Sequence, residues 1–442
     1  MSIATELQNY NDGLLASYNA VSNKGGTVPA NKNLDNLPTA IDSIPAGGGA
    51  KIEEKDVNFY DYDGTLVESW TLAELANKTE LPENPTHSGL TSQGWNWSLS
   101  DLKTYNLPQD VGQMYVPTDG KTHIIIENTP DFLNPIMGLG VNGTATIDWG
   151  DGSTPTVITG TNIDTMQDSP HTYASAGTYE VTIELGAGSS GKIRGSNTYN
   201  QLWKAEYNEP GGTRANRNYY YQIKAMYLGT GWGKLWLSYL GGLKYVTLPA
   251  SQSFVSNYMF SGCDALEYVT IPSGVTTWDN YVFQYDFSLK FVSLPNTALT
   301  RNKGDYMFAN CYALEKVHIP PIWGTIPSHF CEYCYALKKI IMGTSTVDIG
   351  GYSFYNCARL TSVTFPGAVT YMGEQAFGGN TGYLAIVDLS HVTQVPTGNA
   401  LMFGSVNTYY LTGFEIRVPA SLESSFKTAS NWSTYADYIV GV

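Results

Sequence analysis

Two cysteines separated by two residues, Cys331 and Cys334, have the spacing of half a tetrahedral metal site. Such a site needs a second pair of ligands, and the sequence contains no second Cys-x-x-Cys. All five cysteines lie in one repeated segment, where Cys263, Cys311 and Cys357 occupy the position equivalent to Cys334. Equivalent positions of a stacked repeat point the same way, so we expect these thiols to pack as small hydrophobic groups. The sequence therefore predicts no metal and no cofactor, with a metal site at Cys331 and Cys334 as the weaker alternative.

A second segment with catalytic potential is Asp61-Tyr62-Asp63-Gly64-Thr65, which matches the nucleophile motif of haloacid-dehalogenase-type phosphatases. In that motif the first aspartate attacks phosphate and the second transfers a proton. Such an enzyme needs alternating strands and helices after the motif, and the proline-broken sequence beyond Leu66 does not provide them. We therefore favour a β-hairpin with its turn at Asp63-Gly64, followed by a short helix over 71–77.

The composition narrows the class of protein. Only 14% of the residues are charged, whereas tyrosine (32) and glycine (45) are abundant, which favours many short strands and turns. The net charge of −15 argues against a nucleic-acid partner, because phosphate binding needs clustered Lys and Arg. No apolar run is long enough to insert into a membrane. Among the six histidines only His171 lies in a motif, so we find no nucleophile–base pair and expect that the protein is not an enzyme.

The dominant pattern is a repeat in the second half of the chain. Segments such as FANCYALEKVHIP and FYNCARLTSVTFP share a leucine, an apolar residue three positions later, and a proline. A fixed period of this length predicts a solenoid of stacked coils. The period is 23 residues with one step of 25, as seen in Leu243, Leu266, Leu289, Leu314, Leu337 and Leu360.

These repeats resemble the leucine-rich repeats of the BspA type over about 226–442, including a C-terminal cap in VPASLESSFKTASNWSTYADYIV. The resemblance implies a solenoid whose coils each contribute one short strand, with the apolar residues facing inward. The sequence departs from the pattern at Asp286 and Asn380, which replace Cys, and at Cys331, which replaces Phe. The proline after each strand ends the pairing and starts the loop to the next coil.

The outward positions of the predicted strands form columns about 4.8 Å apart along the stack. One column alternates in charge, which favours a single register: Lys244, Glu267, Lys290, Glu315 and Lys338. The next column is aromatic and then basic, and we predict that it binds a ligand such as a sugar ring or a protein. The alternative is that these side chains only stabilise the sheet. The predicted binding residues are Tyr245, Tyr268, Phe291, Lys316 and Lys339.

The N-terminal residues predict an amphipathic helix over 3–22, close to a heptad seam. Such a helix can pack on a neighbour, self-associate or dock to a partner. Together with the Gly47–Gly49 linker, the segment resembles the N-terminal attachment segments of phage tail and baseplate proteins, which implies virion partners and a homotrimer. Its seam consists of Ile3, Leu7, Tyr10, Leu14, Tyr18 and Val21.

Between these parts, residues 121–186 predict a β-sandwich. The motif Asp148-Trp149-Gly150-Asp151-Gly152, followed by His171-Thr172-Tyr173, resembles the polycystic-kidney-disease (PKD) domain, an immunoglobulin-like fold. Members of that family are spacers or interaction modules. Asp148 and Asp151 alone are too few carboxylates for a calcium site.

The expected fold is mainly β. The expected parts are a helical attachment segment and linker (1–50), a small phage-type α+β module (51–120), the PKD-like sandwich (121–186), a connection and cap (187–225) and the capped solenoid (226–442).

Together the resemblances imply a bacteriophage structural and receptor-binding protein of a tail fibre, baseplate or head fibre. It would assemble in the host cytoplasm, lie on the particle surface, and bind a host surface glycan or protein through its repeats. The N-terminus shows no secretory signal, which fits this location. The first alternative is a bacterial cell-surface adhesin with the same modules, which should carry a signal peptide and an anchor. The second is a glycan- or phosphate-processing enzyme, which hydrolysis assays would reveal.

Overall fold

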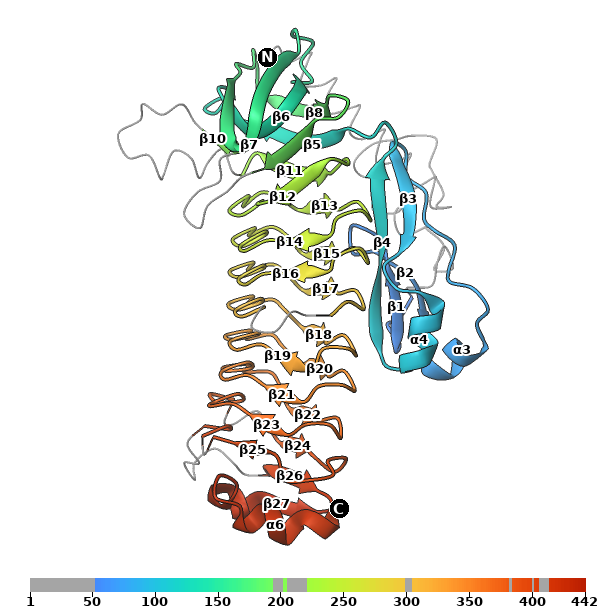
Figure 1. The fold of residues 1–442 in the computed structure, drawn as a ribbon, viewed down its shortest axis with the longest axis vertical. Coiled ribbons are helices and arrows are strands. Elements are labelled where there is room, and N and C mark those ends of the chain that lie inside the picture. The colour runs from blue at the N-terminus through green and yellow to red at the C-terminus, as the bar shows by residue number, and fades with distance from the viewer. Residues whose placement is uncertain are drawn as a thin grey trace, which may run out of the picture. The chain divides into compact units, whose positions relative to one another are not determined.

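The computed structural model describes residues 52–193, 202–204, 221–298, 304–380, 384–399, 401–404 and 413–442. Within it, Lys55–Val442 form one compact unit that is rich in β structure. The helix predicted over 3–22, with its seam residues, lies outside the described residues, as does most of the predicted connection. Three parts follow one another along the described chain: a small α+β module, a nine-stranded sheet and a solenoid (Figure 1).

The module contains a four-stranded sheet in the order β2-β1-β4-β3. Its strands are β1 (Val57–Tyr60), β2 (Leu66–Trp70), β3 (Leu90–Trp95) and β4 (Gln109–Pro117). The predicted hairpin is confirmed, because β1 and β2 pair antiparallel around a turn in which Gly64 has a φ of 84°. The predicted helix is α3 (Leu72–Asn77), which begins at a capping box between Thr71 and Glu74. Helix α4 (Leu99–Tyr105) completes the module.

Strand β1 is buried on both faces of this sheet. Val57 and Phe59 belong to the core of the module, together with Trp70, Trp95 and Leu102. Asn58 and Tyr60 alternate with them and are buried on the opposite face. A sheet of a small module covers only one face with its own helices, so the second face must be covered by another part of the chain.

The strands expected to form a sandwich belong to one hydrogen-bonded sheet of nine strands. Seven follow the order β12-β9-β6-β8-β5-β11-β13, and β7 and β10 pair with β6 outside this order. Strand β6 pairs with β7 on one edge and with β8, β9 and β10 in turn on the other. The immunoglobulin-like fold therefore stays a prediction. The strands are β5 (Thr122–Asn128), β6 (Ile136–Asp148), β7 (Thr156–Pro170), β8 (Gly177–Leu185), β9 (Ser190–Ile193), β10 (Trp203–Lys204), β11 (Ile223–Tyr227), β12 (Trp232–Leu235) and β13 (Tyr245–Thr247).

The two motifs that carry the PKD resemblance lie against each other. The Trp149 indole stacks on the His171 ring with 4.4 Å between centroids, and the Tyr173 hydroxyl donates to the Trp149 carbonyl at 3.0 Å. His171 pairs with the Asp151 carboxylate at 2.9 Å between Nε2 and Oδ2. The Asp148 carboxylate accepts the Gly150 amide proton. Both carboxylates thus hold a turn together.

The same sheet continues into the first coil of the solenoid. Strand β5 pairs antiparallel with β11, and β11 pairs parallel with β13. One hydrophobic core extends from Ile124 in β5 to Ile439 near the C-terminus. The sheet region therefore closes the N-terminal end of the solenoid by backbone pairing.

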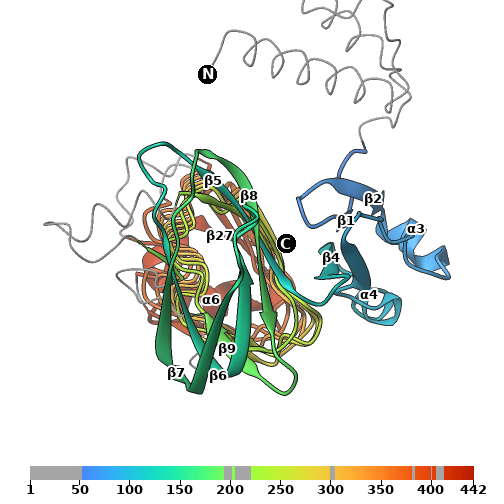
Figure 2. The ribbon, with the colours of Figure 1, turned by 90° about the horizontal axis from the view of Figure 1, so that it is seen from above.

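The solenoid confirms the predicted repeat. One column of parallel strands contains β13, β15 (Tyr268–Thr270), β17 (Phe291–Ser293), β18 (Lys316–His318), β20 (Lys339–Ile341), β22 (Ser362–Thr364), β24 (Ile386–Asp388), β26 (Glu415–Val418) and β27 (Ile439–Gly441). A second column contains β14 (Phe254–Val255), β16 (Thr277–Trp278), β19 (Thr325–Ile326), β21 (Asp348–Ile349), β23 (Tyr371–Met372) and β25 (Thr397–Gly398). Seen from above, the coils lie over one another (Figure 2).

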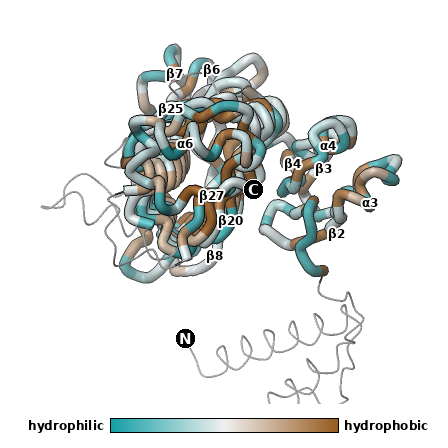
Figure 3. The backbone as a smooth tube through the Cα atoms, turned by 90° about the horizontal axis from the view of Figure 1, so that it is seen from below, coloured by the Kyte–Doolittle hydropathy of each residue, from teal (hydrophilic) through white to brown (hydrophobic). Residues whose placement is uncertain are grey.

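The interior of the coils is apolar, and the predicted cap closes their C-terminal end. Figure 3 shows hydrophobic stretches at β20 and β27 of the solenoid and along α3 of the module. The cap consists of η1 (Ala420–Leu422), α6 (Glu423–Thr428), η2 (Ser433–Tyr438) and β27. Phe426 and Trp432 pack edge to face and cover the last coil.

The cysteines are buried and reduced, as the repeat alignment predicts. The thiols of four cysteines each donate to a backbone carbonyl of the preceding coil, for example Cys311 to Phe283 and Cys334 to Phe308, both at 3.0 Å; the other two are Cys263 and Cys357. Burial raises the pKa of the Cys311 thiol well above its usual value. These four thiols therefore act as hydrogen-bond donors within the core.

Two residues replace cysteine in this column. The Asn380 amide donates to the Phe354 carbonyl at 2.8 Å and so keeps the donor role. The Asp286 carboxylate accepts from the Cys263 amide at 2.8 Å through Oδ1, whereas Oδ2 has no partner among the described residues. Burial raises the pKa of Asp286 well above its usual range.

Candidate binding surfaces

The predicted binding column is covered by the module. Tyr268 is 3% exposed, so the expectation that the column faces solvent is wrong at its centre. Tyr245, Phe291 and Lys316 are partly buried, and only Lys339 is exposed. The physical reason is that the second face of β1 carries the Tyr60 ring, which packs on Tyr268 and Phe291 and removes them from water.

Aromatic and cationic groups fill the contact between β1 and the column. The Tyr60 ring lies 4.5 Å from Phe291 and 5.8 Å from Tyr268 between centroids. The Lys316 ammonium lies 4.6 Å from the Phe291 ring, donates to the Tyr60 hydroxyl at 2.8 Å and pairs with Asp110 at 3.1 Å. The Lys316 side chain is 11% exposed and that of Asp110 3%, so this ion pair is shielded from water. The lysine predicted to bind a ligand thus binds the chain's own module.

Polar contacts fix the register of the module on the solenoid. The Asn96 amide donates to the carbonyls of Ile271 and Ser293 at 2.9 and 3.2 Å, and the Trp97 indole donates to Leu294 at 2.8 Å. Gly112 in β4 fits closely, because a Cβ there would lie 2.1 Å from the Thr270 hydroxyl oxygen. These directed hydrogen bonds and the close fit hold the module in one position, where it covers this face of the strand column.

The neighbouring charge column is present on the solenoid surface. Lys290 pairs with Glu267 at 2.6 Å, and Lys338 pairs with Glu315 at 3.0 Å, each across one coil step. All four side chains are about half exposed, so each pair contributes about 0–1 kcal/mol. Their role is to favour the observed register.

A different aromatic surface lies on the turns that join the second strand column to the first. We call it the tyrosine face. Its first row, the inner row, is a continuous stack of rings with centroids 4.2 to 5.0 Å apart and interplanar angles of 5° to 14°. The turns that carry it lie one above another along one edge of the solenoid (Figure 1). The inner row consists of Tyr258, Tyr281, Tyr306, His329 and Tyr352.

A second row is more exposed. Phe287 stacks on Tyr312 at 5.0 Å, and Tyr312 lies 5.2 Å from Tyr335. With Tyr285, which lies 6.3 Å from Phe287, these side chains are 42–44% exposed. Large apolar groups that gather in three successive coils form a surface patch of the kind that binds partners. We call Tyr285, Phe287, Tyr312 and Tyr335 the outer row.

The backbone explains how the inner row arises. Its residues have φ values of 55° to 60°, a conformation that costs a residue other than glycine about 1–2 kcal/mol. This conformation lets each amide donate to the next coil, for example Tyr281 to Asp305 at 2.9 Å and Tyr352 to Glu374 at 2.8 Å. An aromatic stacking pair returns about 0.5–1.5 kcal/mol. Rings at these strained positions are therefore held rigidly by their neighbours.

The tyrosine face is acidic at its border. Besides the buried Asp286 and the paired charge column, the described residues of these turns carry the carboxylates of Asp264, Asp279, Asp305, Glu332 and Glu374 and the guanidinium of Arg359. Glu332 pairs with His329 at 2.8 Å. Burial raises the pKa of the Tyr258 and Tyr306 phenols above its usual value. Their hydroxyls are neutral hydrogen-bonding groups at physiological pH.

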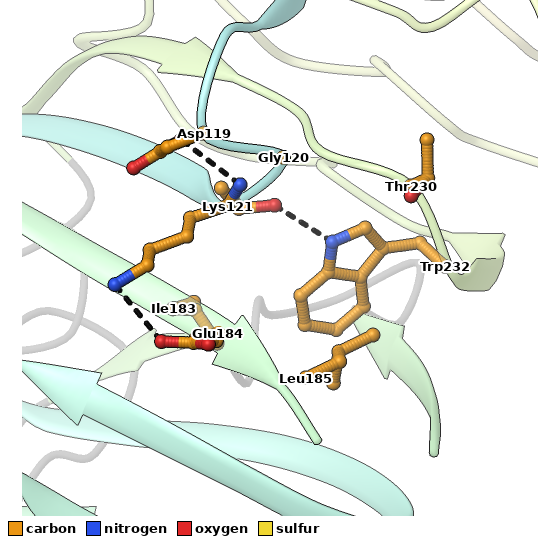
Figure 4. A pocket seen from close by; sticks show the side chains of 9 residues that line it. Asp119, Gly120, Lys121, Ile183, Glu184, Leu185, Thr230 and Trp232 are labelled. Carbon is orange, nitrogen blue, oxygen red and sulfur yellow. Dashed lines mark hydrogen bonds and ion pairs between the residues drawn. The ribbon is translucent and has the colours of Figure 1, made fainter. Parts of the chain in front are cut away.

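One small pocket lies away from both surfaces, between β5, β8 and β12. It has a volume of about 160 Å³, and its walls include the ion pair of Lys121 with Glu184 at 2.9 Å and the Trp232 ring (Figure 4). The Trp232 indole donates to the Thr122 hydroxyl at 2.7 Å. Its polar groups are therefore paired with each other.

Other kinds of site are not found in the part of the chain that the structure describes. No cluster of three or more His, Cys, Asp or Glu residues there could hold a metal ion. No described helix is long and apolar enough to cross a membrane.

Comparisons with known proteins support the nature of the repeats. The family model of the BspA-type leucine-rich repeat region matches residues 237–335 and 324–405. This part of the chain therefore consists of BspA-type leucine-rich repeats, as its spacing indicates. No curated protein matches the chain significantly.

Three solved structures are similar to parts of the chain. A leucine-rich repeat protein from Bacteroides ovatus is 20% identical, with 46% of this chain and 61% of that chain covered and a TM-score of 0.28. A leucine-rich repeat protein from Eubacterium ventriosum is 25% identical, with coverage of 34% and 43% and a TM-score of 0.27. A leucine-rich cell surface protein from Faecalibacterium prausnitzii is 14% identical, with coverage of 54% and 74% and a TM-score of 0.23. The chain thus covers less than two thirds of the first two proteins.

Proposed function

We propose that this protein is a receptor-binding component of a bacteriophage particle, attached by its N-terminal segment and binding a host surface molecule through its repeats. Support for attachment comes from the resemblance of residues 1–45 to phage attachment segments. Support for binding comes from one observation above all, the exposed aromatic surface that runs over successive coils. The nine-stranded sheet would act as a spacer, and trimerisation through the helix predicted over 3–22 would multiply weak contacts.

In this proposal the ligand binds the tyrosine face and not the strand column that the sequence predicts. Tyr268 and Lys316 are used within the chain, by Tyr60 and Asp110 of the module. A ligand would have to displace the module to reach them. The tyrosine face needs no such rearrangement.

A labelled full-length protein should bind intact cells of the phage's host in a saturable way, and its peptides should be found in purified phage particles. Absence of saturable binding to any host strain would contradict the receptor-binding role. Recovery of the chain from a bacterial envelope, and not from particles, would instead support the second candidate, a bacterial surface adhesin with the same repeats. Release of sugar or phosphate from host polysaccharide or phosphate esters would indicate an enzyme.

A further inference from the structure

The arrangement of rings on the tyrosine face decides which groups a ligand can touch. In the inner row the faces of neighbouring rings cover each other, with interplanar angles of 7° between Tyr258 and Tyr281 and 5° between His329 and Tyr352. The ring faces are therefore already occupied, except at the ends of the row. What the row offers outward is ring edges, and for tyrosine the edge ends in a hydroxyl group.

These hydroxyl groups have hydrogen-bonding capacity to spare. Among the described residues, the hydroxyls of Tyr281 and Tyr306 in the inner row have no hydrogen-bond partner, and neither do those of Tyr312 and Tyr335 in the outer row. A phenol hydroxyl can donate one hydrogen bond and accept others. Its best complement is a group that also does both, and the hydroxyls of a sugar are such groups.

The repetition of the surface favours a ligand that repeats as well. An aromatic ring returns at every coil, with centroids 4.2 to 5.2 Å apart between successive coils in both rows, and it is a tyrosine at each position except His329 and Phe287. A linear polymer of identical units can make the same contact at each step, and the contacts then act together. A protein partner would present different side chains along the same line and would typically insert an anchor into a pocket.

The charges around the tyrosine face restrict the charge that a polymeric ligand can carry. Among the described residues, five carboxylates border the face, at Asp264, Asp279, Asp305, Glu332 and Glu374, whereas the cation found there outside the paired charge column is Arg359. The whole chain carries a net charge of −15. A polyanion such as an acidic capsule would be repelled by this border at physiological salt concentration.

We propose that the tyrosine face binds a linear polysaccharide that carries no net negative charge, which lies along the solenoid and receives hydrogen bonds from the edges of the stacked rings. This inference rests on the proposed receptor-binding function and adds the surface and the chemical class of the ligand. The outer row supplies the apolar contact, and the inner row supplies the repeated hydroxyls.

The test uses the full-length chain and soluble polysaccharides of defined composition. Neutral β-glucan, mannan and galactan are compared with the anionic polymers hyaluronate and polygalacturonate by isothermal titration calorimetry. At least one neutral polymer should bind, with an affinity that rises with chain length until the chain spans the rows, and neither anionic polymer should bind. Binding of the anionic polymers, or of none of the neutral ones, would overturn the proposal.

Conservative variants then assign the surface. Tyr281→Phe, Tyr306→Phe and Tyr312→Phe each remove a hydroxyl and keep the ring stack, so the melting temperature should not change. Each should weaken polysaccharide binding about two- to tenfold, the effect of one lost hydrogen bond. Tyr371→Phe is the matched control, because Tyr371 is 43% exposed but lies in β23, outside the face. Unchanged affinity in the combined Phe variant would overturn the proposal.

Cell binding separates this inference from the function on which it rests. Periodate, which cleaves the vicinal diols of sugars, should remove the binding sites from host cells, whereas protease treatment should leave them. If protease and not periodate removes the sites, or if the combined Phe variant binds cells as well as the unchanged protein, the polysaccharide site is wrong and the receptor-binding function stands. If the unchanged protein binds no host cells, the function itself is wrong.

Discussion

The carboxyl group of Asp286 should make the solenoid less stable as the pH rises. It is fully buried in a column where other side chains donate to a carbonyl, and its Oδ2 has no partner among the described residues. Burial raises its folded-state pKa well above the unfolded value, which for Asp is about 3.9. A raised folded-state pKa contributes stability that is fully present below the unfolded pKa and is lost as the pH rises towards the folded pKa.

The variant Asp286→Asn removes the charge and can donate as Asn380 does in the same column. Between about pH 4 and the folded-state pKa of Asp286, the unchanged protein should lose about 1.4 kcal/mol of stability per pH unit relative to the variant. Near pH 4 the two proteins should differ by about 1 kcal/mol or less, the net value of one hydrogen bond. At neutral pH the variant should be the more stable of the two proteins.

Urea unfolding followed by tryptophan fluorescence at pH 4, 5, 6 and 7 measures this difference. The mirror-image control is Asn380→Asp, which should introduce a loss of stability with the same sign and a similar slope. A stability difference that does not change with pH would refute the reasoning, because the carboxyl would then be neither neutral nor desolvated in the folded protein. So would a destabilised Asp286→Asn protein at pH 7.

Three further predictions concern other contacts. Gly112→Ala places a Cβ 2.1 Å from the Thr270 hydroxyl oxygen, so the module should detach from the solenoid. Detachment should appear as faster proteolysis after residue 117, and adding Thr270→Gly should restore resistance to the protease. Lys316→Ala leaves the Asp110 carboxylate buried without its cation and should cost about 3–5 kcal/mol in urea unfolding, whereas Lys338→Ala, in an exposed pair, should cost about 1 kcal/mol or less. Tyr173→Phe removes the hydrogen bond to Trp149 and should cost about 1–3 kcal/mol; a thermal melt identical to that of the unchanged protein would contradict it.

The sequence predicts the solenoid well because its signal is periodic. Leucine and the apolar residue after it recur at the coil period, and the structure buries both, as at Leu314 and Val317. The hairpin at Asp63-Gly64 is predictable for a local reason, since the turn type needs a positive φ that glycine adopts easily. Local chemistry and short-range periodicity thus account for the elements that were predicted correctly.

The docking of the module was not predictable in the same way. Asn58 and Tyr60 alternate with the core residues Val57 and Phe59, which reads equally well as a strand with one solvated face. Nothing in the repeats says that Tyr268 faces another part of the chain, because an aromatic column can be exposed or covered. A contact between residues about 200 positions apart, such as Trp97 with Leu294, leaves no local signature.

The tyrosine face does have a signal in the sequence. Each repeat from the one with Tyr258 to the one with Tyr352 has an aromatic ring five residues before the position of the cysteine column. This regular spacing is visible in an alignment of the repeats. What the alignment does not show is the positive φ of these residues, which tyrosine rarely adopts. Without that geometry, tyrosines in the turns cannot be distinguished from ordinary exposed residues.

The backbone pairing of β5 with β11 and of β11 with β13 has a mechanical consequence. Separate domains joined by a flexible linker swivel when pulled, and the linker absorbs the load. Here the joint is built of the same interstrand hydrogen bonds as the coils beyond it, so it bends no more easily than they do. A force on a ligand bound to the solenoid would therefore be transmitted through the paired strands to the nine-stranded sheet. In the described part of the chain, no flexible linker lies between these two parts to absorb it.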